Sequence, residues 1–404
     1  MQNSNVPRNK FLTSLKLESK VFNFAFVLFG FFLVNQLVGW PLLKFWNISG
    51  IDSGFNRFND LSIVLESARC YPEYGDLVYK NNVECGNYLY GSFLLKLLGV
   101  LNFYSFNIYL AGFLVALMFI VSTAYISAKY LTGGNLLLCL ALFSSPPFHL
   151  MVQRGHIDIF MFSIIVLAIH LMKTKSNYLA TIFIFITVLI KFYTLPLLIY
   201  FVITRRGLAL RIFSALLAVV SVVLIYDDLS LTPVKLNQDY PGRIWGLFGW
   251  EALIRRINET SIADFGLTAT RILSATLFFM AYGLVLIVVR YLREKKEIQL
   301  TTMDSNHSLN EFLVLSIVFV SCFFAGLNYD FRLIFGVAAG IALICILKMS
   351  SRVRNSFLTI LFCIAWLSYQ SGGLEIFGDA LVTLLVAIYL EFWRIIILER
   401  FVSN

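Results

Sequence analysis

Apolar runs recur along the whole chain, and short polar or basic segments separate them. A helix of about 20 apolar residues can cross the hydrocarbon core of a bilayer, because it makes its backbone hydrogen bonds internally. Only 14% of the 404 residues are charged, whereas soluble domains carry about 25%. We therefore predict an all-α polytopic membrane protein with about 12 transmembrane helices, in a range of about 10–13. The expected spans are 21–43, 105–127, 134–150, 156–172, 178–190, 195–204, 208–226, 270–290, 310–327, 332–348, 355–370 and 380–398.

Two of these spans come from one long run, 178–204, which the segment KFYTLP interrupts. Pro196 in this segment should end or kink a helix. The charge of Lys191 is costly inside a span unless the side chain faces a cavity or the membrane surface. The sequence therefore predicts a bend at Lys191, with a short span on each side of it.

Short basic clusters between the apolar runs predict the orientation of the chain. The net charge of +9 is spread over segments such as RYLREKK at 290–296 and KMSSRVR at 348–354, so it does not form one patch for nucleic acid. Loops rich in Lys and Arg stay on the cytoplasmic side. Residues 1–20 are then a cytoplasmic segment without a signal peptide, and residues 21–404 form one transmembrane domain. Both termini are expected in the cytoplasm, and the membrane is expected to be an inner or plasma membrane.

Two long outer loops follow from this orientation, 44–104 and 227–269. The first contains two apolar stripes at helical spacing, over 60–69 and 88–99. Both are too short to span a bilayer, so we expect helices that lie in the membrane interface.

Asp60 opens the first of these helical patterns, and two interpretations of it remain open. An aspartate at this place can cap the helix, a role that Asn, Ser or Thr would serve equally. It can also be a general base at the rim of a cavity, where burial beside lipid would tune its pKa. The two roles do not exclude each other.

Cys70 and Cys85 are the two cysteines in a polar segment, whereas Cys139, Cys322, Cys345 and Cys363 lie in apolar runs. A disulfide between the first two would close a loop on the oxidising side and stabilise it by about 3 kcal/mol. Two unpaired thiols are the alternative, since sequence does not give the geometry of a bond.

Charged residues also stand at the mouths of several expected spans. Arg154, His156 and Asp158 lie within five positions, after the Pro146–Pro147 pair. Such residues can be topology markers, and Lys191 can be a snorkelling lysine. Together they can also form a polar site, in which the cations would meet a phosphate.

Asp330 and Arg332 lie between two later apolar runs, in GLNYDFRLIF. They can pair with each other, or Arg332 can hold an anionic head group through two hydrogen bonds. The chain contains no nucleotide-binding, zinc-hydrolase or serine-hydrolase motif, so neither a cofactor nor a metal is expected. The second outer loop offers further polar and aromatic candidates: Asp239, Arg243, Trp245, Trp250, Glu251, Arg255 and Arg256.

The order of these segments resembles the GT-C fold glycosyltransferases that use polyprenyl-phosphate sugars. The similarity is to the family 87 group, which includes bacterial alpha-1,2-mannosyltransferases. The segments NDLSIVLESA, GDLVY and NYLYGSFLLKLLG are similar to that group's Asp-initiated helix, Gly-x-x-x-Tyr turn and Tyr-rich helix start. The family's Gly-Gln-x-Asn appears here as Gly-His-Ile-Asp over 155–158. KFYTLP stands where the family has Lys-x-x-Pro, with a longer spacing and without preceding glycines, and NYDFRLIF is similar to its late Tyr-Asp segment.

The resemblance implies a GT-C-like bundle with its active site on the outer, extracytoplasmic face. The donor would be a polyprenyl-phosphate sugar carrying mannose or a related hexose or pentose. The acceptor would be a glycan or a lipid-linked glycan, and membrane lipid would surround both. Asp60 would be the base of an inverting transfer. Further substrate-binding residues would be Lys191, Arg332, Asp330, Arg154, His156, Asp158 and Tyr90.

Two other classes of membrane protein compete with this interpretation. A transporter or flippase of lipid-linked sugars would place charges near the bilayer midplane and repeat its two halves. A polysaccharide polymerase is a further polytopic enzyme. Convergence of Asp60, Lys191 and Arg332 on one outer site would favour the glycosyltransferase.

Overall fold

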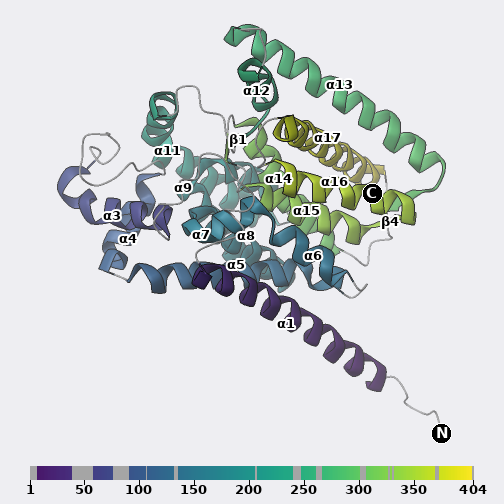
Figure 1. Ribbon diagram of the computed structural model, residues 1–404, viewed down its shortest axis with the longest axis horizontal. Coiled ribbons are helices and arrows are strands. Elements are labelled where there is room, and N and C mark those ends of the chain that lie inside the picture. The colour runs from purple at the N-terminus through teal and green to yellow at the C-terminus, as the bar shows by residue number, and fades with distance from the viewer. Residues whose placement is uncertain are drawn as a thin grey trace.

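The computed structural model describes residues 7–38, 58–75, 91–105, 107–131, 135–204, 207–239, 247–260, 266–300, 306–325, 328–329, 332–368 and 373–402. In this part of the chain the fold is almost entirely helical (Figure 1). Four helices are long and apolar enough to cross a membrane, or five if one bent pair counts as a span. The protein is therefore an all-α membrane protein.

Helices occupy each of the apolar runs expected from the sequence. Their bounds are α1 (Pro7–Val38), α5 (Ile108–Leu131), α6 (Leu136–Phe143), α7 (Pro146–Arg154), α8 (Ile157–Lys173), α9 (Asn177–Ile190), α10 (Leu195–Thr204), α11 (Leu208–Asp239), α13 (Leu267–Glu294), α14 (Asn306–Phe324), α15 (Leu333–Ile346), α16 (Ser351–Leu367) and α17 (Gly373–Val402). The helix α1 begins inside the segment expected to precede the first span.

The span expected over 134–150 is broken into two helices. α6 and α7 are bent by 57° at a short break between them. Pro146 and Pro147 take the first positions of α7, where proline is tolerated, but they cannot donate the hydrogen bonds that would continue α6. The residue before a proline also avoids the helical conformation, and Ser145 is extended.

The break expected at Lys191 is present. α9 ends at Ile190, Lys191 has extended backbone, and a 3₁₀ turn η3 (Phe192–Thr194) leads into α10. Pro196 is the second residue of α10, where its missing N–H has no helical partner to lose. The backbone N–H of Lys191 still donates to Thr187 of α9, at 2.9 Å, while its side chain turns to Asp158 of α8.

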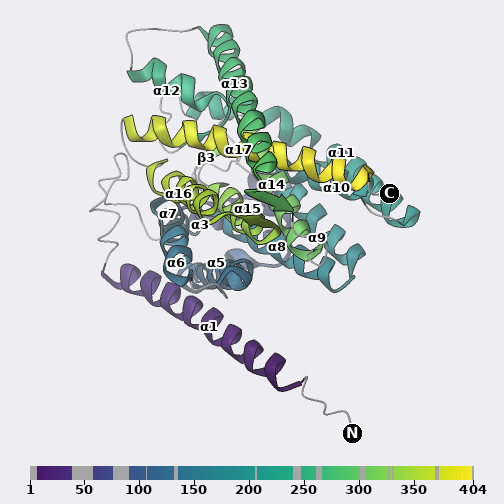
Figure 2. The same cartoon turned by 90° about the vertical axis from the view of Figure 1, so that its right-hand side faces the viewer.

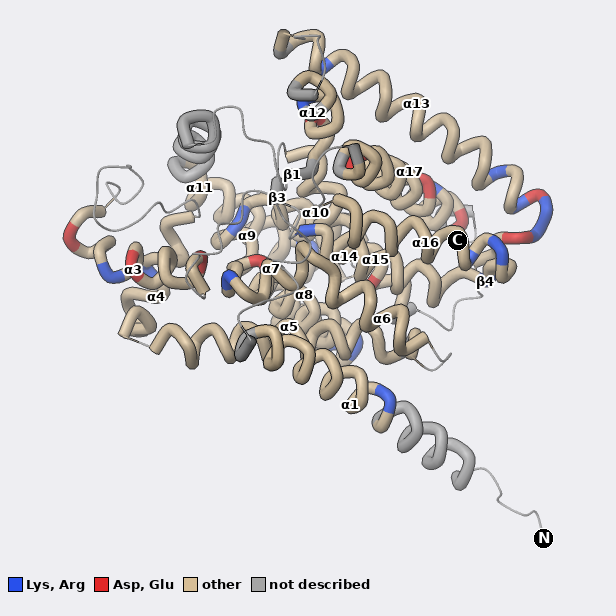
Figure 3. The backbone as a smooth tube through the Cα atoms, in the orientation of Figure 1, with Lys and Arg blue, Asp and Glu red and all other residues tan. Residues whose placement is uncertain are grey.

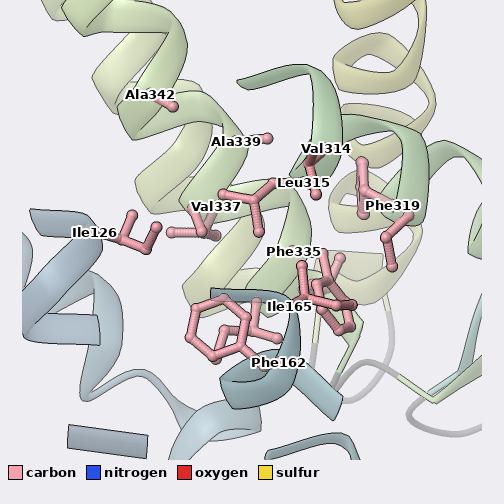
Figure 4. Packing of buried hydrophobic residues seen from close by; sticks show 14 of the residues in the cluster. Ile126, Phe162, Ile165, Val314, Leu315, Phe319, Phe335, Val337, Ala339 and Ala342 are labelled. Carbon is pink, nitrogen blue, oxygen red and sulfur yellow. The ribbon is translucent and has the colours of Figure 1, made fainter. Parts of the chain in front are cut away.

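Helices α5, α8, α14, α15 and α17 surround the apolar core of the bundle (Figures 1 and 4). Figure 4 shows side chains from α5, α8, α14 and α15 meeting there, among them Ile126, Phe162, Phe319 and Phe335. α1 packs against α5 on one face of the bundle, and α13 packs against α17 and crosses it on the opposite face (Figure 2).

Gly336 is a point of close helix packing in this core. A Cβ atom there would lie 2.8 Å from the ring of Phe319, and its carbonyl oxygen accepts a 2.5 Å hydrogen bond from Tyr389 Oη. Gly336→Leu should lower the free energy of unfolding by about 1–3 kcal/mol, because the core has no room for the added side chain. Gly283→Leu is the control, since nothing lies within 4 Å of a Cβ at that position. Thermal unfolding in detergent would compare the two, and equal melting temperatures would contradict the packing argument.

Two short antiparallel strand pairs mark opposite ends of the bundle. β2 (Ile298–Leu300) pairs with β4 (Leu347–Met349) where α13 and α15 end. β1 (Leu247–Phe248) pairs with β3 (Asn328–Tyr329), with Leu247 opposite Tyr329. The sequence patterns predicted no strands.

Three short described helices lie in the two segments expected from the sequence to be outer loops. In the first loop, α3 (Asn59–Tyr74) and α4 (Ser92–Val100) pack against each other and agree with the helices expected over 60–69 and 88–99. The 3₁₀ turn η2 (Phe103–Ser105) follows α4. In the second loop, α12 (Ala252–Thr260) lies against α13 and α17.

Candidate functional site

A cluster of charged side chains lies where α3, the α7–α8 junction, the α9–α10 break and the start of α15 come together. Its members are Asp60, Arg154, His156, Asp158, Lys191, Tyr193 and Arg332, and we call them the charged cluster. Charged residues are otherwise sparse along the middle of the bundle, as the mostly tan tube of Figure 3 shows. Residues that are far apart in the sequence thus form one polar site beside an apolar core.

Asp60 and Arg154 form an ion pair at the α3 side of the cluster. Arg154 donates to Asp60 Oδ1 from Nε at 2.9 Å, and its Nη2 lies 2.7 Å from the same oxygen. The backbone N–H of Phe58 donates to the carbonyl oxygen of Gln153, at 2.9 Å, and so fixes the start of α3 against α7. Asp60 is therefore not the cap of α3. Phe58 occupies that position, and Asp60 lies in the first turn, where a negative charge is favoured.

Gly155 allows α7 and α8 to present their polar side chains on the same side. It ends α7 in the left-handed conformation, with φ of 62°, which favours glycine. A Cβ atom here would lie 3.0 Å from the Cβ of Leu61 in α3. His156 follows as the cap of α8, and its Nδ1 accepts a 3.2 Å hydrogen bond from the backbone N–H of Asp158. In that arrangement the proton of a neutral imidazole is on Nε2.

Asp158 is the buried centre of the cluster, with no exposed side-chain surface. Lys191 Nζ and the hydroxyl of Tyr193 lie 2.5 Å and 2.8 Å from its Oδ1. The charged Nε of Arg332 lies 3.4 Å from its Oδ2. His156 Nδ1, which accepts from the Asp158 N–H, lies 3.3 Å from the same oxygen and does not donate to it. A carboxylate removed from water in this way must be held by opposite charge and hydrogen bonds. Asp158 therefore joins α8 to the α9–α10 break and to α15.

Tyr193 was not among the candidates from the sequence, although it lies in KFYTLP. Besides its bond to Asp158, its ring lies 4.6 Å from the guanidinium carbon of Arg332. The ring also packs edge-on to Phe335. The sequence signal that could have pointed to Tyr193 is its place two residues after Lys191, at the break between two apolar runs. Its role depends on contacts with α8 and α15, which no local pattern gives.

Tyr193→Phe should lower the free energy of unfolding by about 1.5–3 kcal/mol, because it removes a hydrogen bond to a charged, buried carboxylate. The ring and its stacking on Arg332 would remain. Tyr226→Phe is the matched control, since Tyr226 is 69% exposed. Unfolding in a denaturant series in micelles would measure both variants. A loss below about 0.5 kcal/mol for Tyr193→Phe would show that the hydroxyl contributes little.

Exposure within the cluster is lowest at Asp158 and highest at Arg154. The exposed fraction of the side chain is 5% for Lys191 and 14% for Arg332, and it rises to 25% for Arg154, whereas Asp60 keeps 12%. Burial raises the pKa of Asp60 above its ordinary value, and the neighbouring Arg154 opposes that rise. A ligand would therefore reach Asp60, Arg154 and Arg332 more easily than Lys191.

Other candidates from the sequence are not part of the described cluster. Tyr90, Cys85, Asp330 and the outer-loop residues Arg243 and Trp245 lie outside the described residues. Cys70 is disulfide-bonded, and the four cysteines of the apolar runs form no disulfide.

A separate group of charges lies in the second loop. The carboxylate of Glu251 accepts bonds from Arg255 and from Arg271. Trp250 precedes it, and its backbone N–H donates to the carbonyl oxygen of Phe323. Asp239 and Arg256 lie in helices α11 and α12.

The cluster mixes carboxylates and one histidine with cations. Within the described ranges, no group of three or more His, Cys, Asp or Glu side chains is placed to hold a metal ion.

Comparison of the chain with protein-family models, with characterised proteins and with solved structures found no match.

Proposed function

We propose that the protein is a glycosyltransferase that moves a sugar from a polyprenyl-phosphate donor to a glycan or glycolipid acceptor. The proposal includes a GT-C-like bundle of about 12 spans, with the charged cluster on the extracytoplasmic side. One observation carries it. Asp60, a partly exposed carboxylate, stands at the accessible side of a buried cluster in which cations outnumber carboxylates.

The charge balance of the cluster suits an anionic ligand. Its described members include three cations, on Arg154, Lys191 and Arg332, and two carboxylates, on Asp60 and Asp158. With His156 neutral, one positive charge is left over. The phosphodiester of a lipid-linked sugar carries one negative charge, and arginine can bind two of its oxygens at once. Arg332 and Arg154 are the cations accessible enough to meet it.

One carboxylate oxygen of Asp60 is bound to Arg154, and the geometry leaves the other able to act as a base. Nε and Nη2 of Arg154 contact Oδ1, so the carboxylate is held in a fixed orientation. Its Oδ2 faces His156 Nε2 at 3.9 Å, which is too long for a hydrogen bond. Oδ2 is therefore the oxygen that can take the proton of an acceptor hydroxyl. Attack on the face opposite the leaving phosphate would invert the anomeric carbon, by analogy with inverting glycosidases.

The pH dependence of the transfer should reflect Asp60. Only the ionised carboxylate accepts a proton, so the rate falls as pH drops through its pKa. Because burial raises that pKa, the acid limb of kcat/KM should lie above pH 3.8, the ordinary value for Asp. Arg154→Gln removes the charge that lowers the pKa, so the limb should move to higher pH. An acid limb that stays in place in Arg154→Gln would contradict the assignment of Asp60.

The test of the function is direct. Purified protein is incubated with a panel of polyprenyl-phosphate sugars and a membrane glycolipid extract. Mass spectrometry then shows which donor is consumed and which lipid gains a sugar residue. Consumption of one donor with release of polyprenyl phosphate is the expected result. The proposal fails if every donor remains intact although the protein is folded and its active-site residues are unmodified.

A further inference from the structure

A group of exposed cations lies at the end of the bundle that is opposite α3 and α4. We call Lys295, Lys296, Lys348, Arg352 and Arg354 the basic patch, and all five are exposed. Figure 3 shows blue and red segments together at the end of α13, and blue segments beside β4. Nearby arginines have protein partners: Arg290 pairs with Glu294, and Arg293 pairs with Glu399.

The patch is built on folded structure. The β2–β4 pairing places Gln299 opposite Lys348. The backbone N–H of Ser350 donates to the carbonyl oxygen of Glu297 at 2.9 Å, and its hydroxyl lies 3.0 Å from Glu297 Oε2. These bonds hold the end of α13 beside the start of α16. Positive charges that only set the orientation of the chain in the membrane can lie anywhere in a loop. The fixed arrangement of these cations is therefore not needed for orientation.

The patch lies next to the ends of two apolar helices, α13 and α15. The apolar stretch of α13, Thr268–Glu294, ends next to Lys295, and little of it is buried inside the protein. The apolar helix α15 ends at Ile346, two residues before Lys348. Side chains such as Ile272, Phe279 and Ile287 are more than 60% exposed along α13. Acyl chains that cover α13 would bring their phosphates to the patch.

Among the described residues, no member of the patch forms an ion pair, although Lys295 lies 5.8 Å from the ring centre of Tyr291. Arg352 and Arg354 lie in the first turn of α16, which contains no acidic residue. The positive end of a helix disfavours cations and favours anions. Their placement is thus unfavourable for the protein alone and favourable if an anion lies beside them.

We propose that the basic patch binds the phosphate groups of anionic phospholipids whose acyl chains lie along α13. The ligand is an anionic lipid head group, such as phosphatidylglycerol, in the leaflet at this end of the bundle. Each cation near a charged membrane surface contributes about fivefold in affinity, so a pair contributes about 25-fold. The proposal does not depend on the function of the charged cluster.

The test uses the whole protein in nanodiscs of phosphatidylcholine with and without phosphatidylglycerol. Native mass spectrometry after transfer to detergent counts the lipids that remain bound. The wild type should retain phosphatidylglycerol in preference to phosphatidylcholine, and the double variant Arg352→Gln/Arg354→Gln should lose that preference about 25-fold. This variant should melt no lower than the wild type, because it relieves an unfavourable interaction with the helix dipole.

Two further variants separate lipid binding from folding. Lys295→Gln/Lys348→Gln removes two members of the patch outside the first turn of α16 and should also weaken retention. Arg69→Gln/Lys96→Gln neutralises two exposed cations at the other end of the bundle and should leave retention unchanged. Equal retention of the two lipids by the wild type would overturn the proposal. So would a loss in the control variant as large as the loss in the patch variants.

Discussion

Asp60→Asn is expected to lower the rate of sugar transfer by about 10²–10⁴, the usual contribution of a general base. The asparagine side chain has the same shape, and its amide oxygen can still accept from Arg154. The fold should therefore persist while the proton acceptor is lost. Initial rates of polyprenyl-phosphate release would measure the effect. Glu66→Gln is the matched control, because Glu66 is exposed on the same helix, α3.

The rate of the Asp60→Asn variant can also contradict the assignment of Asp60 as the base. If it keeps more than about a tenth of the wild-type rate, Asp60 is not the base. Asp52, which precedes α3 in the first outer loop and lies outside the described residues, would then be the next carboxylate to test.

Asp158→Asn should cost about 3–5 kcal/mol in the free energy of unfolding, the usual effect of breaking a buried ion pair. The reason is that Lys191 lies 2.5 Å and Arg332 3.4 Å from this carboxylate. Both cations would stay buried, but the negative charge of Asp158 that balances them would be gone. Denaturant unfolding in micelles, with retention on a sizing column as a second readout, would measure the loss.

A double variant tests whether the cost comes from the charge left behind. Asp158→Asn combined with Lys191→Met should recover part of the loss, because removing both members of a buried pair is less costly than removing one. If the single Asp158→Asn variant is within about 1 kcal/mol of the wild type, the carboxylate does not hold the cluster together.

The helices and the break at Lys191 were predictable because both depend on local properties of the chain. Apolar runs form helices in a membrane whatever their partners are. The proline and charge of KFYTLP act within one turn of their own positions. The bend between α6 and α7 had a comparable signal in Pro146 and Pro147, but the apolar residues on each side made a single span the simpler prediction.

The arrangement of the charged cluster depends on contacts between distant parts of the chain. Asp60 and Arg154 are 94 positions apart, and their contact needs the packing of α3 on α7. The sequence indicated which charged residues stood at helix ends. It did not indicate that Lys191 would be committed to Asp158, or that Tyr193 would join it. The strand pairs were missed for the same reason, since each links two segments of two or three residues.

The measurement that tests the central claim most directly follows a polyprenyl-phosphate sugar in sealed proteoliposomes. The donor and a glycolipid acceptor are supplied on one side, and mass spectrometry reports whether the donor is cleaved or crosses the bilayer intact. We predict cleavage, with release of polyprenyl phosphate and a glycosylated acceptor, by the wild type and by Glu66→Gln but not by Asp60→Asn. Intact donor on the far side with no cleavage, unaffected by Asp60→Asn, would contradict the account and identify a transporter.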